Sequence, residues 1–199
     1  KVHENFPERV FDVGIAEQHA VTFSAGLSAQ QMIPYCTIYS TFLQRAYDQL
    51  IHDVALQQLP VVFCIDRAGI VGTDGATHHG YFDISFLRSV PNMTVSAPMD
   101  EIDFQNLLFT AQFSDSPFSI CFPRGNTARH QQSDQPFKKL EIGKAEELKK
   151  GNGTAILSFG RIGNRIKNIL DSDKLSQEIK QNTGHYKFLF CKPIDTDLL

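Results

Sequence analysis

Short apolar runs alternate with longer segments of helical periodicity along most of the chain. The runs have the length of β-strands, and the longer segments carry apolar residues three or four positions apart, as the buried face of a helix requires. This alternation is typical of an α/β fold with a mostly parallel sheet flanked by helices. The pattern predicts strands at 9–13, 34–39, 61–65, 93–97, 118–122, 154–159 and 186–191, and helices at 18–31, 40–57, 100–113 and 162–170.

Three of these elements carry more specific signals. The run 61–65 has no polar position, as expected of a strand buried on both faces in the centre of a parallel sheet. Thr41 and Gln44 have the spacing of a capping box, in which two side chains reciprocally satisfy backbone N–H groups. Asp100 is placed to cap the helix that follows it.

The pattern stops between residues 126 and 139, where the sequence is polar and has no period. We interpret 127–140 as a linker between a first domain, 1–126, and the start of a second α/β domain, 141–199. The sequence does not begin with methionine, and the second domain has too few elements for a full sheet. We therefore expect the beginning of the first domain and the rest of the second to lie outside this chain.

Composition excludes several classes of partner. Hydrophobic residues make up 42% of the 199 positions and the net charge is −3, so neither nucleic acid nor an anionic membrane is an expected partner. No apolar run approaches the roughly 18 residues of a membrane helix. Cys36, Cys64 and Cys121 lie in apolar runs, which favours reduced, buried thiols and a cytoplasmic location.

Polar residues capable of chemistry follow the ends of the predicted strands. Glu17 follows the first strand, Tyr39 ends the second, Arg67 follows the third and Arg124 follows the strand at 118–122. Ligands of open parallel sheets bind at the edge where the strands end, so we expect these groups to converge there.

The segment 67–80 is the most distinctive stretch among them. It combines four glycines with Arg67, Asp74 and the adjacent His78 and His79, and loops this long inside compact domains are often functional. A metal site is disfavoured, because adjacent histidines rarely point the same way and a third neutral ligand is missing. A phosphate-binding P-loop is excluded, since no Lys-Ser or Lys-Thr pair follows the glycines.

Four blocks of sequence carry a family resemblance. They are Val-Gly-Ile-Ala-Glu-Gln-His-Ala (13–20), Ile-Tyr-Ser-Thr-Phe-Leu-Gln-Arg-Ala-Tyr-Asp-Gln (38–49), Asp-Arg-Ala-Gly-Ile-Val-Gly-Thr-Asp-Gly-Ala-Thr-His-His-Gly (66–80) and Pro-Arg-Gly-Asn (123–126). In this order they resemble the 1-deoxy-D-xylulose-5-phosphate synthases, a family of transketolase-like thiamine-diphosphate enzymes. The resemblance implies a pyrimidine-binding domain followed by the start of a transketolase C-terminal domain, in a cytoplasmic homodimer.

The resemblance also implies a reaction and its cofactors. Members of the family are transferases that join pyruvate to D-glyceraldehyde 3-phosphate, release CO₂, and supply isoprenoid, thiamine and pyridoxal synthesis. Their cofactors are thiamine diphosphate and Mg²⁺. The family's Gly-Asp-Gly motif for Mg²⁺ and diphosphate is absent from this sequence, so we expect no metal ligands here and no activity from the chain alone. Two alternatives are another thiamine-diphosphate enzyme, which the blocks at 14–19 and 39–45 disfavour, and a non-catalytic dimerisation domain.

The resemblance assigns cofactor roles to four residues. Glu17 is expected to hydrogen-bond N1′ of the aminopyrimidine, Phe42 to stack on that ring, and Ile15 to line the pocket. Arg45 either reaches the site or pairs with Asp48. Without the resemblance, Glu17 would be interpreted as stabilising a helix N-terminus, and Phe42 as an ordinary core residue.

Substrate roles fall to five residues by the same resemblance. Arg67 and Arg124 suit the phosphate of glyceraldehyde 3-phosphate, although either could equally form a surface ion pair. His78 is expected to exchange protons with the substrate, and Asp74 to orient the substrate or His78. The remaining member of the set is Tyr39. Outside the set, we expect His185 to be solvated.

Overall fold

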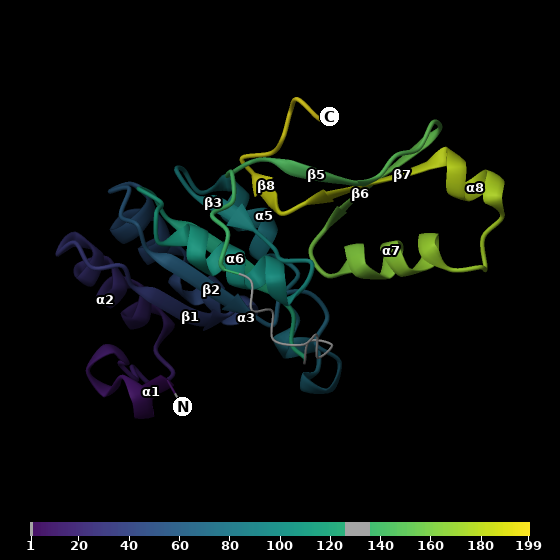
Figure 1. Cartoon of the computed structure of the whole chain (residues 1–199). Helices are drawn as coiled ribbons and strands as arrows, with labels where there is room; N and C mark the ends of the chain where they lie inside the picture. Colours follow the sequence, from purple (N-terminus) through teal and green to yellow (C-terminus); the bar gives the residue numbers. More distant parts are fainter. Residues whose placement is uncertain (1, 126–135) are drawn as a thin grey trace.

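The computed structural model describes residues 2–125 and 136–199, and it contains two β-sheets (Figure 1). The larger sheet has five strands in the order β1-β2-β4-β3-β8. The first four run parallel and β8 pairs antiparallel with β3, which confirms the mostly parallel sheet. Its strands are β1 (Tyr35–Tyr39), β2 (Val62–Asp66), β3 (Thr94–Ser96), β4 (Phe118–Phe122) and β8 (Phe190–Lys192).

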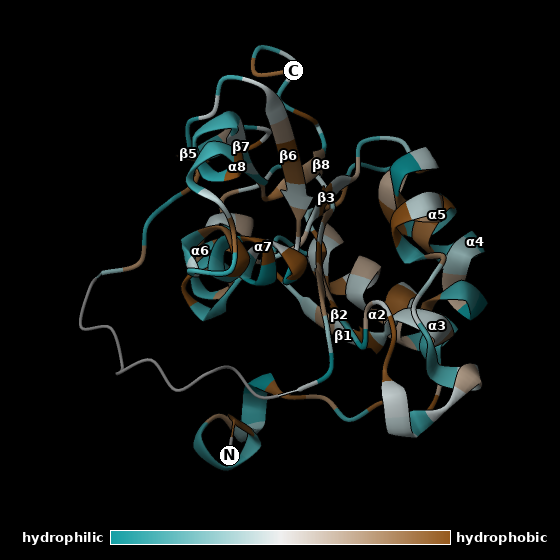
Figure 2. Cartoon of the chain, turned by 90° about the vertical axis from the view of Figure 1, so that its right-hand side faces the viewer, coloured by the Kyte–Doolittle hydropathy of each residue, from teal (hydrophilic) through white to brown (hydrophobic). Residues whose placement is uncertain are grey.

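Helices cover both faces of this sheet (Figure 2). On one face lie α2 (Glu17–Ala29), α5 (Asp83–Ser89) and the helical segment 40–55; on the other lies α6 (Glu101–Ala111). Segment 40–55 comprises α3 (Ser40–Leu43), a 3₁₀ turn (Gln44–Ala46), α4 (Tyr47–Gln49) and a π-helical turn (Leu50–Ala55). The remaining short elements of the first 125 residues are α1 (Val2–Asn5) and 3₁₀ turns at Pro7–Arg9, Gly72–Asp74 and Ala76–His78.

The central strand β2 separates the hydrophobic core into two clusters, one on each face of the sheet. Phe63 and Ile65 of β2 pack in the cluster beneath α2 and α5, while Val62 and Cys64 pack in the cluster beneath α6. All four are buried, which confirms the prediction of a strand covered on both faces. The thiols of Cys36, Cys64 and Cys121 are also free and buried, as predicted, and burial raises the pKa of Cys64 to about 12.

The smaller sheet has three strands in the order β5-β7-β6. It is joined to the larger sheet because β7 is followed, after Leu189 alone, by β8. The elements of this part are β5 (Ala145–Lys149), β6 (Thr154–Phe159), α7 (Ile162–Asp171), α8 (Gln177–Asn182) and β7 (Thr183–Phe188). None of the helices in the described ranges is long and apolar enough to cross a membrane.

Several local predictions are wrong. Residues 10–13 form no strand; instead Phe11 packs edge-on against Phe23 of α2, with ring centroids 5.3 Å apart. The predicted strand 186–191 is divided between the two sheets, and β5, α5 and α8 were not predicted. The predicted linker falls largely on 126–135, outside the described residues, and 136–140 contains neither helix nor strand. The division into domains at these positions stays a prediction.

Two side-chain predictions are also wrong. Thr41 and Gln44 do not form a capping box: the Thr41 hydroxyl donates to the Thr77 carbonyl at 3.3 Å, and the Gln44 amide donates to the Thr41 carbonyl at 2.9 Å. His185 is 1% exposed rather than solvated, and its Nε2 lies 2.8 Å from the Ser158 hydroxyl. The predicted cap of α6 is confirmed, since the Asp100 carboxylate accepts from the Asp103 N–H group at 2.9 Å.

Candidate functional site

A row of stacked side chains begins where β1 ends. Tyr39 is the last residue of β1, and Phe42 lies three residues later in α3. The two rings stack with centroids 6.1 Å apart, and the His78 ring meets the Phe42 ring edge-on at 5.3 Å. Arg67 continues the row, since its Cζ lies 3.7 Å from the centre of the Tyr39 ring. Residues from two separate strand ends therefore meet, as predicted.

Asp74 joins two arginines that follow neighbouring strands. Its Oδ2 accepts from Arg67 Nε at 3.2 Å, and its Oδ1 accepts from Arg124 Nη1 at 2.6 Å. β2 and β4 pair side by side, with Asp66 opposite Phe122, so the residues that follow them emerge at the same edge. Arg124 also donates to the Thr73 hydroxyl at 2.7 Å.

The charges of this cluster are balanced. Arg67 pairs with both Asp66 and Asp74, and Arg124 pairs with Asp74. Burial acts to lower the pKa of Arg67, but Asp66, Tyr39 and Asp74 together raise it above its ordinary value. Each guanidinium has five N–H groups and uses only part of them here, so both arginines retain donors for an anion. Arg124 is the more accessible of the two, at 43% exposure against 19% for Arg67.

The loop that carries Asp74 and His78 is closed at its base by backbone hydrogen bonds. Gly69 N–H donates to the Gly80 carbonyl at 3.1 Å, and Gly80 N–H donates to the Gly69 carbonyl at 2.8 Å. We refer to residues 69–80 as the 69–80 loop. Inside it, the Thr77 hydroxyl lies 2.9 Å from His78 Nδ1. His79 accepts from the Val71 N–H group at 3.2 Å, so it supports the loop.

Glu17 is placed differently from the rest. It is the first residue of α2 and is only 9% exposed. Within residues 2–125 and 136–199, its carboxylate has no hydrogen-bond or ion-pair partner, and none joins it to the cluster around Asp74. Ile15, which precedes it, is 93% exposed. Within the described residues, therefore, no hydrogen bond or ion pair joins Glu17 or Ile15 to the predicted substrate residues.

Arg45 lies beside the Phe42 ring. Its Cζ is 5.6 Å from the centre of the Phe42 ring, a cation–π contact. Asp48, the alternative partner considered for Arg45, lies 3.8 Å from His52 Nε2. The structure thus places Arg45 beside a predicted cofactor residue.

Two residues that contribute to this region were not identified from the sequence. Ser40, at the start of α3, donates through its hydroxyl to Asp83 Oδ2 at 2.9 Å, and both are buried. Neither has a sequence signal of its own, although Ser40 stands inside the block 38–49. Burial raises the pKa of Asp83, and hydrogen bonds from Ser40 and the Ile84 N–H group oppose the shift.

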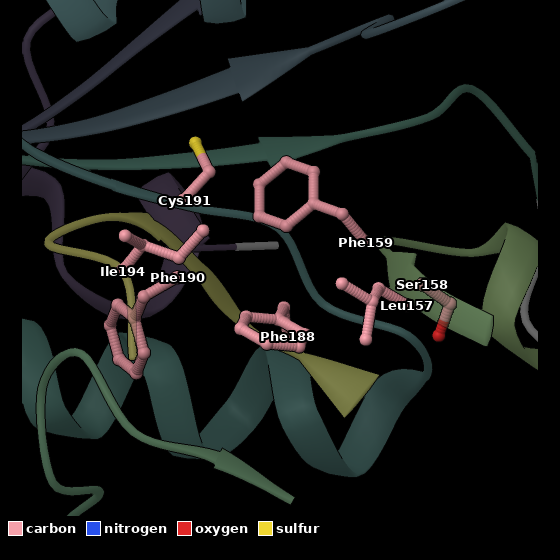
Figure 3. A pocket seen from close by; sticks show the side chains of 7 residues that line it. All are labelled: Leu157, Ser158, Phe159, Phe188, Phe190, Cys191 and Ile194. Carbon is pink, nitrogen blue, oxygen red and sulfur yellow. The ribbon is translucent and has the colours of Figure 1, made fainter. Parts of the chain in front are cut away.

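A separate apolar cavity of about 150 Å³ lies where the two sheets meet (Figure 3). Its only polar lining side chain among the described residues is Ser158, whose hydroxyl is already engaged with His185. An apolar cavity of this kind offers no donor to a phosphate or a carboxylate. The full lining is Leu157, Ser158, Phe159, Phe188, Phe190, Cys191 and Ile194.

The fold is therefore an α/β domain with a mostly parallel sheet covered on both faces, in which Glu17 begins α2 and two arginines follow the ends of β2 and β4. Residues 1–129 match the family described as "Transketolase, pyrimidine binding domain", and the chain belongs to this family. Its curated relatives include proteins named 1-deoxy-D-xylulose-5-phosphate synthase, which confirms the resemblance found in the four sequence blocks.

The similarity to these relatives extends over almost the whole chain. The Cytophaga hutchinsonii protein is 51% identical and the Aquifex aeolicus protein 52% identical, each over 98% of this chain. The chain spans about 30% of the length of each of these relatives. A solved structure titled "Split gene transketolase, inactive beta4 tetramer" superimposes with a TM-score of 0.82 at 26% identity, covering 100% of this chain and 63% of that one.

Proposed function

We propose that this chain carries the pyrimidine-binding part of a thiamine-diphosphate-dependent transferase. The whole protein condenses pyruvate with D-glyceraldehyde 3-phosphate to 1-deoxy-D-xylulose 5-phosphate and releases CO₂. The observation that carries the proposal is Glu17, a residue only 9% exposed at the start of α2, whose carboxylate has no hydrogen-bond or ion-pair partner within the described residues. The names of relatives at about 50% identity support the reaction.

The residues around Glu17 and Phe42 fit the aminopyrimidine ring. Within the described residues, the Glu17 carboxylate engages no other group and its oxygens are not fully buried, so they are open to a ligand. A ring nitrogen that can carry a proton satisfies Glu17, which then holds or moves the proton at N1′. Phe42 offers an aromatic surface and Arg45 lies beside it. Thiamine diphosphate, when bound, supplies the carbanion chemistry. We assign no ligand for Mg²⁺ in this chain.

The cluster around Asp74 fits the phosphorylated substrate. Arg67 and Arg124 are held together by one carboxylate, and both retain N–H donors for phosphate oxygens. The Tyr39 ring supports the Arg67 guanidinium, whose Cζ lies 3.7 Å from the ring centre. His78, held by Thr77 and the edge of Phe42, is placed to give a proton to a substrate oxygen or to accept one.

Substitution of Glu17 tests the proposal in the whole protein loaded with thiamine diphosphate. We expect Glu17→Ala and Glu17→Gln to slow exchange of the cofactor C2 proton at least about 100-fold, since general acid–base groups contribute on this order. The exchange is measured by NMR after dilution into D₂O. Glu8→Ala, in an exposed turn, is the matched control and should exchange at the wild-type rate. Wild-type exchange in Glu17→Ala would falsify the role of Glu17.

The non-catalytic alternative rests on a separate observation. The solved structure that this chain resembles is titled an inactive tetramer, so a domain of this fold can assemble without activity. We propose that the isolated 199-residue chain releases CO₂ from pyruvate no faster than buffer with free cofactor, and that the whole protein is a homodimer. Robust turnover by the isolated chain contradicts the first statement, and sedimentation of the whole protein tests the second. The cytoplasmic location stays a prediction.

A further inference from the structure

We propose that Ser40 and Asp83 form a positioning pair that fixes the 69–80 loop against Phe42, and so sets the distance between the cofactor ring and the phosphate-binding arginines. This inference rests on the proposed function of Phe42 and the arginines. Neither Ser40 nor Asp83 is expected to touch substrate or cofactor, because they are 1% and 2% exposed. They act on the site indirectly, by holding the backbone at the base of the 69–80 loop.

The base of the loop rests directly on Ser40. A Cβ atom added at Gly80 would lie 2.3 Å from the Ser40 hydroxyl oxygen and 2.6 Å from the Arg67 carbonyl oxygen. The backbone of Gly80 is thus enclosed between the start of α3 and the residue that follows β2. Because Gly80 also forms both backbone hydrogen bonds with Gly69, any shift at Ser40 reaches the base of the loop.

The same contact surface continues to the reactive side chains. Phe42 comes two residues after Ser40, and His78 comes two residues before Gly80; their rings meet at 5.3 Å. Between these two contacts, the Thr41 hydroxyl donates to the Thr77 carbonyl at 3.3 Å. Three consecutive residues of α3 therefore face residues of the loop. The contact of Ser40 with Gly80 is the innermost and the most buried of the three.

Asp83 fixes the orientation of Ser40. Its Oδ2 accepts from the Ser40 hydroxyl at 2.9 Å, and its Oδ1 accepts from the Ile84 N–H group at 2.7 Å. Asp83 is the first residue of α5, whose other end is held by Lys192 of β8 through the Arg88 carbonyl at 2.9 Å. The acceptor is thus anchored at both ends of its helix, and Ser40 is held against a fixed point.

The first test measures loop closure and does not depend on catalysis. In the 199-residue chain, we expect Ser40→Ala to speed amide hydrogen exchange at Gly69 and Gly80 by at least about tenfold, because the buried Asp83 oxygen loses its donor. Exchange at Phe63 and Cys64 of β2 should not change. Asp83→Asn keeps one acceptor oxygen for the Ile84 N–H group, and its amide N–H can donate to the Ser40 oxygen, so exchange at both glycines should stay slow. If exchange at these glycines is unchanged in Ser40→Ala and in Asp83→Ala, the pair does not hold the loop.

The second test separates positioning from stability in the whole protein. We expect Ser40→Ala to raise KM for glyceraldehyde 3-phosphate about tenfold, with KM for pyruvate unchanged, and Asp83→Asn to stay near wild type. Equal changes in both KM values, or none, overturn the positioning role. If the wild-type protein turns over neither substrate while Ser40→Ala still loosens the glycines, the proposed function fails and the pairing of Ser40 with Asp83 stands.

Discussion

Three carboxylates near the site differ in what surrounds them, and their proposed roles follow from this difference. Asp83 has both oxygens occupied by donors, which suits a fixed support. Asp74 is shared by two arginines, which suits a group that keeps them in place while retaining spare donors for a phosphate. Glu17 is buried and lacks a partner within the described residues, which suits a group that meets a ligand.

Removing Arg124 should weaken recognition of the substrate phosphate specifically. We expect Arg124→Ala to raise KM for glyceraldehyde 3-phosphate about 10- to 100-fold, because hydrogen bonds to charged groups contribute roughly 1.5–3 kcal/mol. Asp74 keeps its bond to Arg67, so the loop should remain closed. Unphosphorylated D-glyceraldehyde is the matched control, and its KM should not change. A parallel loss with both aldehydes would show that Arg124 does not bind the phosphate.

The sequence predicted the residues of the cluster but not their supports. Tyr39, Phe42, Arg67 and Asp74 stand in blocks that resemble a family, and strand ends in a parallel sheet meet at one edge. Asp83 has no such signal, because a lone acid before an apolar helix is ordinarily interpreted as a helix-start residue. His185 was misjudged for a related reason: in a polar neighbourhood of sequence, only the packed structure shows that its ring is buried.

Helices and strands were predicted wrongly where contacts with neighbouring elements decide the local structure. The run 9–13 has strand-like residues, but a strand needs a neighbour to pair its backbone, and Phe11 packs on helix α2 instead. The segment 40–57 has helical spacing, yet it forms four short turns of different type between Ser40 and Ala55. The central strand β2 was predicted well, because burial on both faces leaves a clear apolar run.

An ion triad between elements provides a stability test. Lys187 of β7 bonds Asp103 of α6 at 3.0 Å and Glu146 of β5 at 2.8 Å, and Asp103 is 6% exposed. We expect Lys187→Met to lower the free energy of unfolding by about 3 kcal/mol, since breaking a buried pair leaves an uncompensated charge. Urea denaturation of the chain measures this. Lys150→Met, at an 87% exposed side chain, should change it by less than about 0.5 kcal/mol.

The double variant distinguishes the ion pair from simple packing. Lys187→Met combined with Asp103→Leu removes both charges of the more buried pair and should recover most of the lost free energy. If the double variant is less stable than Lys187→Met alone, the loss comes from packing at the sheet junction rather than from the unpaired Asp103 carboxylate.

At the scale of the whole molecule, the two sheets form a continuous structure. β7 belongs to the smaller sheet and β8 to the larger, with Leu189 between them and its carbonyl accepting from Ala97 N–H at 2.9 Å. The Asn164 amide of α7 adds a bond to the Met99 carbonyl at 2.6 Å. The sequence shows a single apolar run at 186–191, because the end of β7 and the start of β8 consist of the same types of residue. Unfolding of the smaller sheet should therefore disturb the larger one.

Lowering the pH, which protonates His185, tests whether the two sheets unfold together. Burial lowers the pKa of His185 below its ordinary value of about 6.5, with Asp171 raising it and Lys167 lowering it less strongly. The folded state thus favours neutral His185, and the unfolded chain takes up a proton more readily. The stability contributed by this group is complete above pH 6.5 and is lost as the pH falls through and below that value.

We therefore expect the chain to unfold at lower urea concentration at pH 5 than at pH 7.5, and His185→Gln to reduce that difference. His52→Gln is the control, because His52 is exposed on the surface, and it should keep the wild-type pH dependence. Since β7 and β8 are consecutive, loss of the smaller sheet at pH 5 should coincide with loss of the larger, giving one transition by circular dichroism and by tyrosine fluorescence. Two separate transitions at pH 5 would show that the sheets unfold independently despite the strands that join them.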